Sequence, residues 1–381
     1  MTSWGATSAL LVAAGLLLAL LMAIAQRRLH RATPPPAPRF LPGVSILKPL
    51  KGVDAHLREN LQSIFRLDYP EYEVILGTED PADPALAVAR SVASEHPGVP
   101  AVVVANPGIV GFNPKVNNLA NLVGLARYPT LLISDSNVRV PPEHLKDLAA
   151  HRALAGGGLV WALFRGTHAR GLGGALESLQ LNVAVMGGVS GLMHMLKIPC
   201  AVGKSMLVDR EDLEGIGGFP FLGRFLAEDH VCAEELAARG RPVVVAGCLI
   251  DNVLGRRTLR EFAARHLRWA RVRRHVSLPC YLVEVVLNPS FLALLSLLIC
   301  RTAEAALVAG TALVGMSAIA WWAERDLGVQ RAWWLYPLLE LGLCATKGIL
   351  WFVPFFSRTV VWRGHSLALG SRSQIELATS V

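Results

Sequence analysis

The fold of this chain is decided by Val44-Ser45-Ile46-Leu47-Lys48, a short apolar run that ends on a charged residue, and by its counterpart Thr-Leu-Leu-Ile-Ser-Asp at 130–135. Runs of this kind are typical of buried strands in an α/β sheet. Further runs alternate with helical patterns along the first third of the chain. The expected strands are 44–48, 73–77, 101–105 and 130–135, and the expected helices are 54–65, 84–95 and 115–126. This alternation predicts a mostly parallel α/β sheet.

Polar residues follow several of the expected strands. In α/β sheets, ligands bind beyond the carboxyl ends of the strands, so these positions are the first candidates for a functional site. They are Lys48-Pro49 after the first strand, Glu79-Asp80 with Asp83 after the second, and Asp135-Ser136-Asn137 after the fourth.

The composition indicates a membrane protein. Of the 381 residues, 52% are hydrophobic and 17% are charged, and the net charge is nevertheless +8. Residues 7–25 carry no charge, and at about 1.5 Å per residue they can cross a hydrocarbon core of about 30 Å. Basic residues follow this run instead of preceding it, which is the reverse of a secretory signal peptide. We therefore expect an uncleaved anchor whose C-terminal end lies in the cytoplasm.

Apolar character returns near the C-terminus in three blocks at 282–300, 303–322 and 333–356, each expected to be long enough to span with some tilt. Four spans would put the C-terminal tail on the outside, whereas Arg358, Arg363 and Arg372 favour the inside, so one late block is suspected not to cross fully. Another apolar stretch, 183–198, interrupts the globular part and is expected to be interfacial or buried.

Several common chemistries have no signature here. The six cysteines form no C-x-x-C pair, and the chain contains no zinc pattern, no G-x-x-x-x-G-K-[ST] and no G-x-S-x-G. These absences argue against a zinc-binding domain, a P-loop nucleotide triphosphatase and a serine hydrolase. The cysteines are typical of small buried side chains in a reducing compartment, and no nucleic-acid partner is expected.

The acids and cations of the chain suit a nucleotide sugar. Such a donor carries a diphosphate whose negative charge grows as the sugar bond breaks, so its enzyme needs cations and carboxylates that can hold a divalent ion. Oxygen ligands suit Mg²⁺ or Mn²⁺, and Asp135 is the candidate ligand. It stands in Asp-Ser-Asn and not in an aspartate pair, so its metal affinity alone is expected to be modest.

A second acid, Asp229, follows Glu228 and opens a helical pattern. A carboxylate at a helix N-terminus stays ionised and can accept a proton from an attacking hydroxyl. The alternative is that Asp229 only caps the helix.

A basic pentad at 265–269 places Arg265 and Arg268 on one helical face beside Trp269. Guanidinium groups suit diphosphate oxygens and an indole can line a sugar or acceptor pocket. The alternative is a basic helix lying on anionic lipid, since further arginines surround the pentad, and both interpretations stay open.

Taken in order, seven blocks of this sequence resemble the ceramide glucosyltransferase family, and the flanking membrane segments match as well. The blocks are Leu-Lys-Pro-Leu-Lys-Gly-Val-Asp at 47–54, Leu-Asp-Tyr-Pro at 67–70, Asp-Pro-Ala-Asp-Pro-Ala at 80–85, Asn-Pro-Lys-Val-Asn-Asn-Leu at 113–119, Ser-Asp-Ser-Asn-Val-Arg-Val at 134–140, Ala-Glu-Asp at 227–229, and R-x-x-R-W at 265–269.

The resemblance implies an α/β fold with a GT-A-type, Rossmann-like domain that binds a nucleotide sugar, flanked by transmembrane helices. The implied organisation is an N-terminal transmembrane anchor at 1–30, a Pro-rich linker at 31–43, a cytoplasmic glycosyltransferase domain at 44–255, a basic interfacial helix with R-x-x-R-W at 256–281, C-terminal membrane helices at 282–357 and a tail at 358–381.

The resemblance also implies roles for individual residues. Asp229 would be the general base, and Asp135 would serve the metal and the diphosphate. The remaining donor-site residues would be Asp83 at the nucleotide, Lys115, and Arg265, Arg268 and Trp269 at the pyrophosphate and acceptor region. For Lys115, the alternative is an ordinary cation at a helix start.

The implied reaction is the transfer of glucose from UDP-glucose to the primary hydroxyl of ceramide, with inversion to a β-glycoside. A bilayer-held lipid acceptor explains the membrane segments, because its tail cannot leave the bilayer cheaply. Two alternatives remain: a hopanoid glycosyltransferase that uses UDP-N-acetylglucosamine and a bacteriohopane polyol, and a non-catalytic membrane-anchored binding protein. Composition favours a bacterial inner membrane with the catalytic domain in the cytoplasm.

Overall fold

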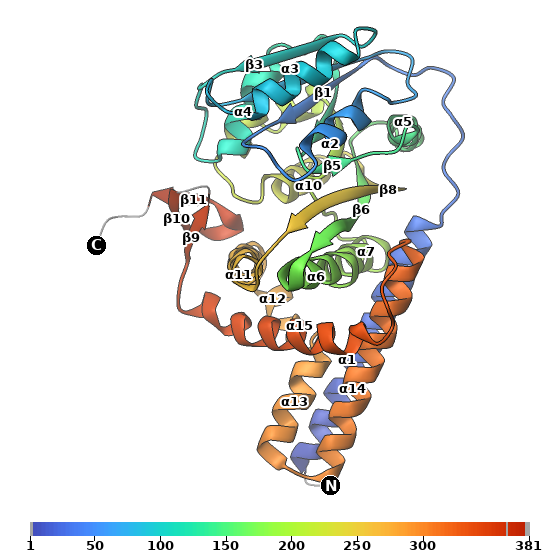
Figure 1. Cartoon of the computed structure of the whole chain (residues 1–381), viewed down its shortest axis with the longest axis vertical. Helices are drawn as coiled ribbons and strands as arrows, with labels where there is room; N and C mark the ends of the chain where they lie inside the picture. Colours follow the sequence, from blue (N-terminus) through green and yellow to red (C-terminus); the bar gives the residue numbers. More distant parts are fainter. Residues whose placement is uncertain (1–2, 363–364, 378–381) are drawn as a thin grey trace. The chain divides into compact units, whose positions relative to one another are not determined.

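The computed structural model describes residues 3–362 and 365–377, and these form two compact units (Figure 1). We call them the sheet unit, Leu29–His168 with Leu196–Gly255, and the helical unit, the described parts of Met1–Arg28, Ala169–Met195 and Arg256–Val381. The globular domain expected at 44–255 therefore contains one segment, 169–195, that belongs with the membrane-type helices.

The described part of the sheet unit is built on a sheet of eight strands. Their order is β3 (Ala101–Ala105), β2 (Tyr72–Thr78), β1 (Val44–Pro49), β4 (Thr130–Ser134), β7 (Ser205–Asp209), β6 (Leu159–Arg170), β8 (Val243–Arg256) and β5 (Val138–Arg139). The four strands expected from the sequence are confirmed to within about two residues at each end.

The strands run parallel in one half of this sheet and antiparallel in the other. β1 pairs in parallel with β2 and β4, and β2 pairs in parallel with β3. β7 pairs antiparallel with β4 and β6, and β5 pairs antiparallel with β8. The expectation of a mostly parallel sheet therefore holds for one half only. Strand direction depends on the end from which the chain returns, and the residues of a strand do not encode that.

The order of the parallel strands creates a switch point. The chain moves from β1 to β2 and β3 on one side, and then returns through α4 to place β4 on the other side of β1. Lys48 and Asp135 lie at the carboxyl ends of β1 and β4, next to this point, which is where α/β sheets bind ligands. The helices of the unit are α2 (Leu57–Ile64), α3 (Ala85–Glu95), α4 (Pro114–Val123), α5 (His144–Ala155), α8 (Arg210–Gly215), α9 (Gly218–Leu222) and α10 (Glu228–Ala238).

Apolar side chains from strands and helices form the core of the sheet unit. Ile46, Val74 and Leu132 on adjacent parallel strands are fully buried, as are Leu61 of α2 and Val116 of α4. Because helices cover the sheet, the strands can be apolar along their whole length. The polar ends of β1 and β4 are therefore held by a rigid support.

The helical unit consists mainly of helices that are far apart in the sequence. They are α1 (Ser3–His30), α6 (Gly171–Leu179), the π-helix η1 (Gln180–Val185), α7 (Met186–His194), α11 (Leu259–Val276), α12 (Leu278–Val283), α13 (Pro289–Cys300), α14 (Ala303–Asp326), α15 (Leu335–Phe352) and the short η2 (Val353–Phe355). The tail adds β9 (Thr359–Trp362), β10 (His365–Leu369), η3 (Ser371–Ser373) and β11 (Ile375–Leu377), in which β10 pairs antiparallel with both other strands.

Helices α1, α13 and α14 lie side by side in a bundle (Figure 1). Val12 of α1 packs with Ala293 of α13 and Ala312 of α14, and such small residues allow close approach of helices in lipid. An ion pair of 2.9 Å joins Arg27 to Asp326, so the C-terminal ends of α1 and α14 lie together.

Three helices of the described chain are long and apolar enough to cross a membrane: Ala6–His30, Ala303–Asp326 and Leu335–Phe355. The block at 282–300 was expected to be long enough as well, but it is divided into α12 and the 12-residue α13. At 1.5 Å per residue, α13 alone covers about 18 Å, which is less than a hydrocarbon core.

Helix α15 lies across one end of the bundle instead of running along it (Figure 1). Near its start, the hydroxyl of Tyr336 donates to Glu324 at the end of α14. Further along, Glu340 accepts from Ser290 at the start of α13. Near its end, Gly348 lies against Phe291, also at the start of α13. The partners of α15 therefore stay at one level of the bundle.

Residues 183–195 of the apolar stretch at 183–198 belong to the helical unit and are buried in part. The side-chain amide of Gln26 in α1 donates to the carbonyl of Asn182, at 3.0 Å. Gly187 and Gly191 of α7 face Met22 of α1. The segment is not among the candidate spans of the described chain, and its expected interfacial or buried position stays a prediction.

Candidate active site

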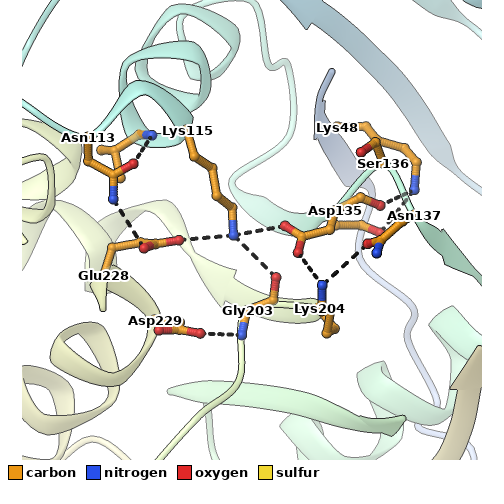
Figure 2. A network of polar contacts seen from close by, with 12 residues as sticks. Lys48, Asn113, Lys115, Asp135, Ser136, Asn137, Gly203, Lys204, Glu228 and Asp229 are labelled. Atoms are coloured by element: carbon orange, nitrogen blue, oxygen red, sulfur yellow. Dashed lines mark hydrogen bonds and ion pairs between the residues drawn. The ribbon is translucent and has the colours of Figure 1, made fainter. Parts of the chain in front are cut away.

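A network of charged side chains lies at the switch point of the sheet unit (Figure 2). Its members come from five places: the end of β1, the loop after β4, the segment just before β7, the start of α4 and the start of α10. Three acids and three lysines take part: Asp135, Glu228, Asp229, Lys48, Lys115 and Lys204.

Asp135 is the centre of the network. Its Oδ1 lies 2.8 Å from the ammonium of Lys115, and its Oδ2 lies 2.9 Å from the ammonium of Lys204. Burial works against ionisation of this carboxyl, but Lys115 and Lys204 outweigh it and hold the pKa of Asp135 well below its usual range. The carboxylate is therefore ionised at neutral pH, and both its oxygens carry a cation.

Lys115 is positioned by the cap of α4. Asn113 accepts the N–H of Val116 and so begins the helix, with Pro114 at its first turn. The Lys115 ammonium contacts Asp135, Glu228 at 2.9 Å and the carbonyl of Gly203 at 3.3 Å. Burial opposes its charge, yet Asp135 and Glu228 raise the pKa of Lys115 above its ordinary value.

Glu228 is the buried acid of the network. Besides Lys115, it accepts a hydrogen bond of 3.2 Å from the side-chain amide of Asn113, which also donates to the Phe225 carbonyl. Burial raises the pKa of Glu228, against the pull of the Lys115 ammonium. Asn113 thus links the start of α4 to the start of α10.

Asp229 follows at the second position of α10 and is half-buried. Its Oδ2 accepts the Gly203 N–H at 2.6 Å and its Oδ1 accepts the His230 N–H at 2.8 Å. A Cβ at Gly203 would lie 3.0 Å from Asp229 Oδ2 and 3.1 Å from the Lys115 ammonium. A glycine at 203 therefore lets the chain pass close to both groups.

Lys48 lies beneath this network and is fully buried. Its ammonium donates to the Asp135 carbonyl at 2.8 Å, to Ser134 Oγ at 3.3 Å and to the Val138 carbonyl at 3.4 Å. Burial lowers the pKa of Lys48 to about 7, in spite of the opposing effect of Asp135. Lys48 thus holds the loop that carries Asp135.

The two residues after Asp135 are also engaged with the protein. Ser136 Oγ donates to Asp54, and the side-chain amide of Asn137 donates to Asn252 at 2.7 Å. Asn137 also accepts a hydrogen bond of 3.3 Å from Lys204. Asn137, two residues after Asp135, therefore contacts one of the two lysines that bind Asp135.

Not every predicted site residue joins this network. The carboxylate of Asp83 accepts the Gly52 N–H, at 2.8 Å to Oδ2 and 3.0 Å to Oδ1, and the Ala85 N–H at 2.8 Å. It thereby ties the loop after β1 to the start of α3. Gly52 has a positive φ of 66°, which favours glycine at this turn.

The residues of R-x-x-R-W lie in α11, which belongs to the helical unit. Arg265 forms an ion pair of 3.0 Å with the buried Glu177 of α6, and its guanidinium stands 5.0 Å from the centre of the Trp269 ring. Arg257 occupies the other oxygen of Glu177, at 2.6 Å. Arg268 is half-buried on the same helix.

The donor set at Asp135 does not fit a divalent ion in this arrangement. A metal would have to displace Lys115 or Lys204 from a carboxylate oxygen. In the part of the chain that the structure describes, no group of three or more His, Cys, Asp or Glu side chains is arranged to hold a metal. The expectation of Mg²⁺ or Mn²⁺ at Asp135 stays a prediction that this geometry does not support.

Sequence reasoning did not select Lys204, Glu228 or Asn113 as site residues. Lys204 directly precedes β7, a strand that was not expected. Glu228 and Asn113 stand in the same motif blocks as the predicted residues Asp229 and Lys115. Membership of these blocks is the signal that could have identified them.

The fold is that of the GT-A class. A solved structure with this fold is the mannosyltransferase PcManGT from Pyrobaculum calidifontis in complex with GDP-Man and Mn²⁺. The TM-score is 0.53 at 20% sequence identity, and the match covers 91% of this chain and 99% of that chain. The expected GT-A-type fold is thus confirmed.

Residues 7–375 match the model of glycosyl transferase family 21, and the chain belongs to that family. It is 27% identical over 330 residues to ceramide glucosyltransferase 1 of Caenorhabditis elegans, covering 86% of this chain and 66% of that protein. It is 30% identical over 237 residues to ceramide glucosyltransferase 3 of the same organism, covering 61% and 51%. The chain thus spans between about half and two thirds of the length of these relatives. The resemblance to ceramide glucosyltransferases is confirmed, and the protein is a glycosyltransferase.

Proposed function

We propose that this glycosyltransferase moves glucose from UDP-glucose to the primary hydroxyl of ceramide and inverts the sugar linkage. The observation that carries the proposal is the position of Asp229, a half-buried acid at a helix start beside a cluster of lysines. The names of the curated relatives support the donor and the acceptor.

Asp229 suits the role of general base. Two backbone N–H groups hold its oxygens, and the N-terminal end of α10 favours its negative charge. In the proposed step, the acceptor hydroxyl gives its proton to Asp229 while its oxygen attacks the anomeric carbon. The bond from that carbon to the diphosphate breaks, and the electron pair leaves with UDP. One displacement from the opposite face inverts an α-linked donor, so no covalent enzyme intermediate is needed.

The ammonium groups beside Asp229 suit the departing diphosphate. Lys115 and Lys204 are largely buried, with side chains 13% and 10% exposed. Fixed charges in such surroundings stabilise developing negative charge more strongly than they would in water. No step of this mechanism passes through a metal ion.

Further donor contacts are proposed for residues outside this network. Asp83 shapes the loop after β1 and is proposed to contact the nucleotide. Arg265, Arg268 and Trp269 are proposed to hold the pyrophosphate and acceptor region. The ion pair with Glu177 and the contact with Trp269 keep Arg265 in a defined orientation, as such a role needs.

We also propose that the protein is an integral membrane enzyme of the bacterial inner membrane, with the sheet unit in the cytoplasm. The apolar helices support membrane insertion. Because α15 lies across one end of the bundle, the proposed crossings are α1 and the hairpin of α13 and α14, in which the 12-residue α13 needs a locally thinner bilayer, and the chain then returns to the side of α11. Arg358 and Arg372 then lie on the cytoplasmic side, as the distribution of positive charge favours.

A transfer assay in detergent-lipid micelles tests the function. Ceramide and a bacteriohopane polyol are offered separately, each with UDP-glucose or UDP-N-acetylglucosamine, and lipid products are resolved by mass. A hexose on ceramide is expected. An N-acetylhexosamine on the polyol would keep the mechanism but replace both substrates, and no product in any arm would favour a binding protein without catalysis.

A further inference from the structure

The two lysines on Asp135 differ in how many of their N–H donors the protein uses. Lys115 has three acceptors for its three donors: Asp135, Glu228 and the Gly203 carbonyl. For Lys204, the interactions described are two, with Asp135 Oδ2 at 2.9 Å and Asn137 Oδ1 at 3.3 Å. One N–H of Lys204 is therefore left for a further acceptor.

The surroundings of Lys204 restrict where that donor can go. The residue is only 8% exposed, and it directly precedes β7, which pairs with β4 at the residue before Asp135. The Asp135 N–H donates to the Lys204 carbonyl at 3.2 Å, so the two residues are bound through backbone as well as side chain. The ammonium is thus held at the switch point, where a ligand of this fold is expected.

The side chain of Asp135 is the only carboxylate of the Asp-Ser-Asn block, and both its oxygens are taken. In place of a second acid, Asn137 supplies a neutral oxygen that accepts from Lys204. A neutral amide oxygen attracts a divalent ion less strongly than a carboxylate, and it can equally well orient an ammonium. The set of donors and acceptors therefore favours two monovalent cations over one divalent ion.

We propose that Lys204 binds the diphosphate of the sugar donor, and that the ammonium groups of Lys204 and Lys115 occupy Asp135 in place of a divalent metal ion. Lys115 is the fixed member, because all its N–H donors are used within the protein. Lys204 is the member that contacts substrate. The inference rests on the proposed use of a nucleoside-diphosphate sugar and adds that donor binding does not require a metal.

The experiment is a calorimetric titration of UDP into the purified full-length protein in detergent, first with EDTA and then with Mn²⁺ or Mg²⁺. UDP is expected to bind in EDTA with an affinity that the metals change by less than about threefold, because Lys115 and Lys204 already supply two positive charges. Binding that disappears in EDTA and returns with Mn²⁺ would overturn the inference while leaving the proposed function intact. Absence of UDP binding in every condition would overturn both.

Variants locate the effect. Lys204→Met is expected to weaken UDP binding in EDTA by about tenfold or more, the usual effect of removing a charged hydrogen bond. It should also make the remaining binding respond to Mn²⁺, because one oxygen of Asp135 is released. Lys204→Arg keeps the positive charge and should retain most of the affinity. The matched control is Lys146→Met, which removes a cation paired with Asp68 on the exposed surface of the same unit and should change nothing. Equal UDP affinity in Lys204→Met and the unsubstituted protein would refute the assignment.

Discussion

Two acids of this protein are each held by two cations, one in each unit. In the sheet unit, Asp135 contacts Lys115 and Lys204, and its side chain is 23% exposed. In the helical unit, Glu177 contacts Arg257 and Arg265, and its side chain is 2% exposed. The same ratio of charges therefore surrounds a partly exposed acid in one unit and a buried acid in the other.

The difference between the two clusters lies in the cations as well as in the burial. Lysine is a compact charge on a flexible stem whose donors can turn toward a substrate, whereas arginine presents a planar fork with fixed directions. The lysines stand where chemistry is proposed, and the arginines join α11 to α6 by a buried acid. We infer that the first cluster serves the proposed reaction, and that Glu177 in the second holds α11 in place and orients Arg265 for its proposed contact with the pyrophosphate and acceptor region.

The sheet unit also contains Asp229, the acid proposed as general base, which has no counterpart in the Glu177 cluster, and its removal should have the largest effect. Asp229→Asn is expected to reduce transfer by about 10³-fold, because the attacking hydroxyl loses its proton acceptor. UDP affinity should stay within about twofold. Single-turnover kinetics and calorimetry measure the two quantities, and Glu235→Gln on the same helix is the control. Turnover that survives the substitution would remove Asp229 as the base.

The central acid of the sheet unit comes next. Asp135→Asn should lower the turnover number by about 10²-fold, because Lys115 and Lys204 lose the acid that orients them. Its effect on thermal stability should be smaller than that of the buried Glu177. Asp68→Asn, at an exposed ion pair, should leave turnover unchanged. An Asp135 variant with a lower melting temperature but an unchanged turnover number would reverse the roles assigned to the two clusters.

The reverse pattern is expected in the helical unit. Glu177→Gln should destabilise the protein by about 1–3 kcal/mol, because two partly exposed guanidinium groups lose their buried counter-charge. Thermal unfolding in detergent measures this, with Glu376→Gln at an exposed pair as the control. An unchanged melting temperature would show that the Glu177 cluster does not hold α11.

A substitution at Gly203 tests the close packing around Asp229 and Lys115 in the sheet unit, with a smaller expected effect. Gly203→Ala places a methyl group about 3 Å from both Asp229 and Lys115, and should reduce turnover by about tenfold through their displacement. Gly124→Ala is the matched control, since nothing lies within 4 Å of a Cβ there. Equal activity of both variants would mean that the contact between Gly203, Asp229 and Lys115 tolerates the displacement.

A pH dependence of stability is also expected. The pKa of Lys48 is about 7 in the folded protein against 10.5 in the unfolded chain. Between these values the unfolded state binds more protons, so stability should rise with pH through this range and be lowest below pH 7. Lys48→Met should flatten this part of the profile in thermal unfolding between pH 6 and 9. An equally steep profile in the variant would assign the dependence to other groups.

The sequence by itself determined the local elements and much of the candidate site. Short β-branched runs predicted β1 to β4, and the motif blocks selected Asp135, Lys115 and Asp229, which the structure brings into one network. The strand predictions succeed because the burial of a strand is a property of neighbouring positions.

Only the tertiary structure decided the relations between distant segments. The antiparallel entry of β7 brings Lys204 to Asp135, and the packing of α6 on α11 gives Arg265 its acid. Likewise, hydropathy indicated that 333–356 avoids water. The contacts of α15 with Glu324 and Ser290 decided that this helix lies across the bundle. The physical reason is that hydrophobicity measures how strongly a segment avoids water, whereas direction and partners depend on contacts between residues far apart in the chain.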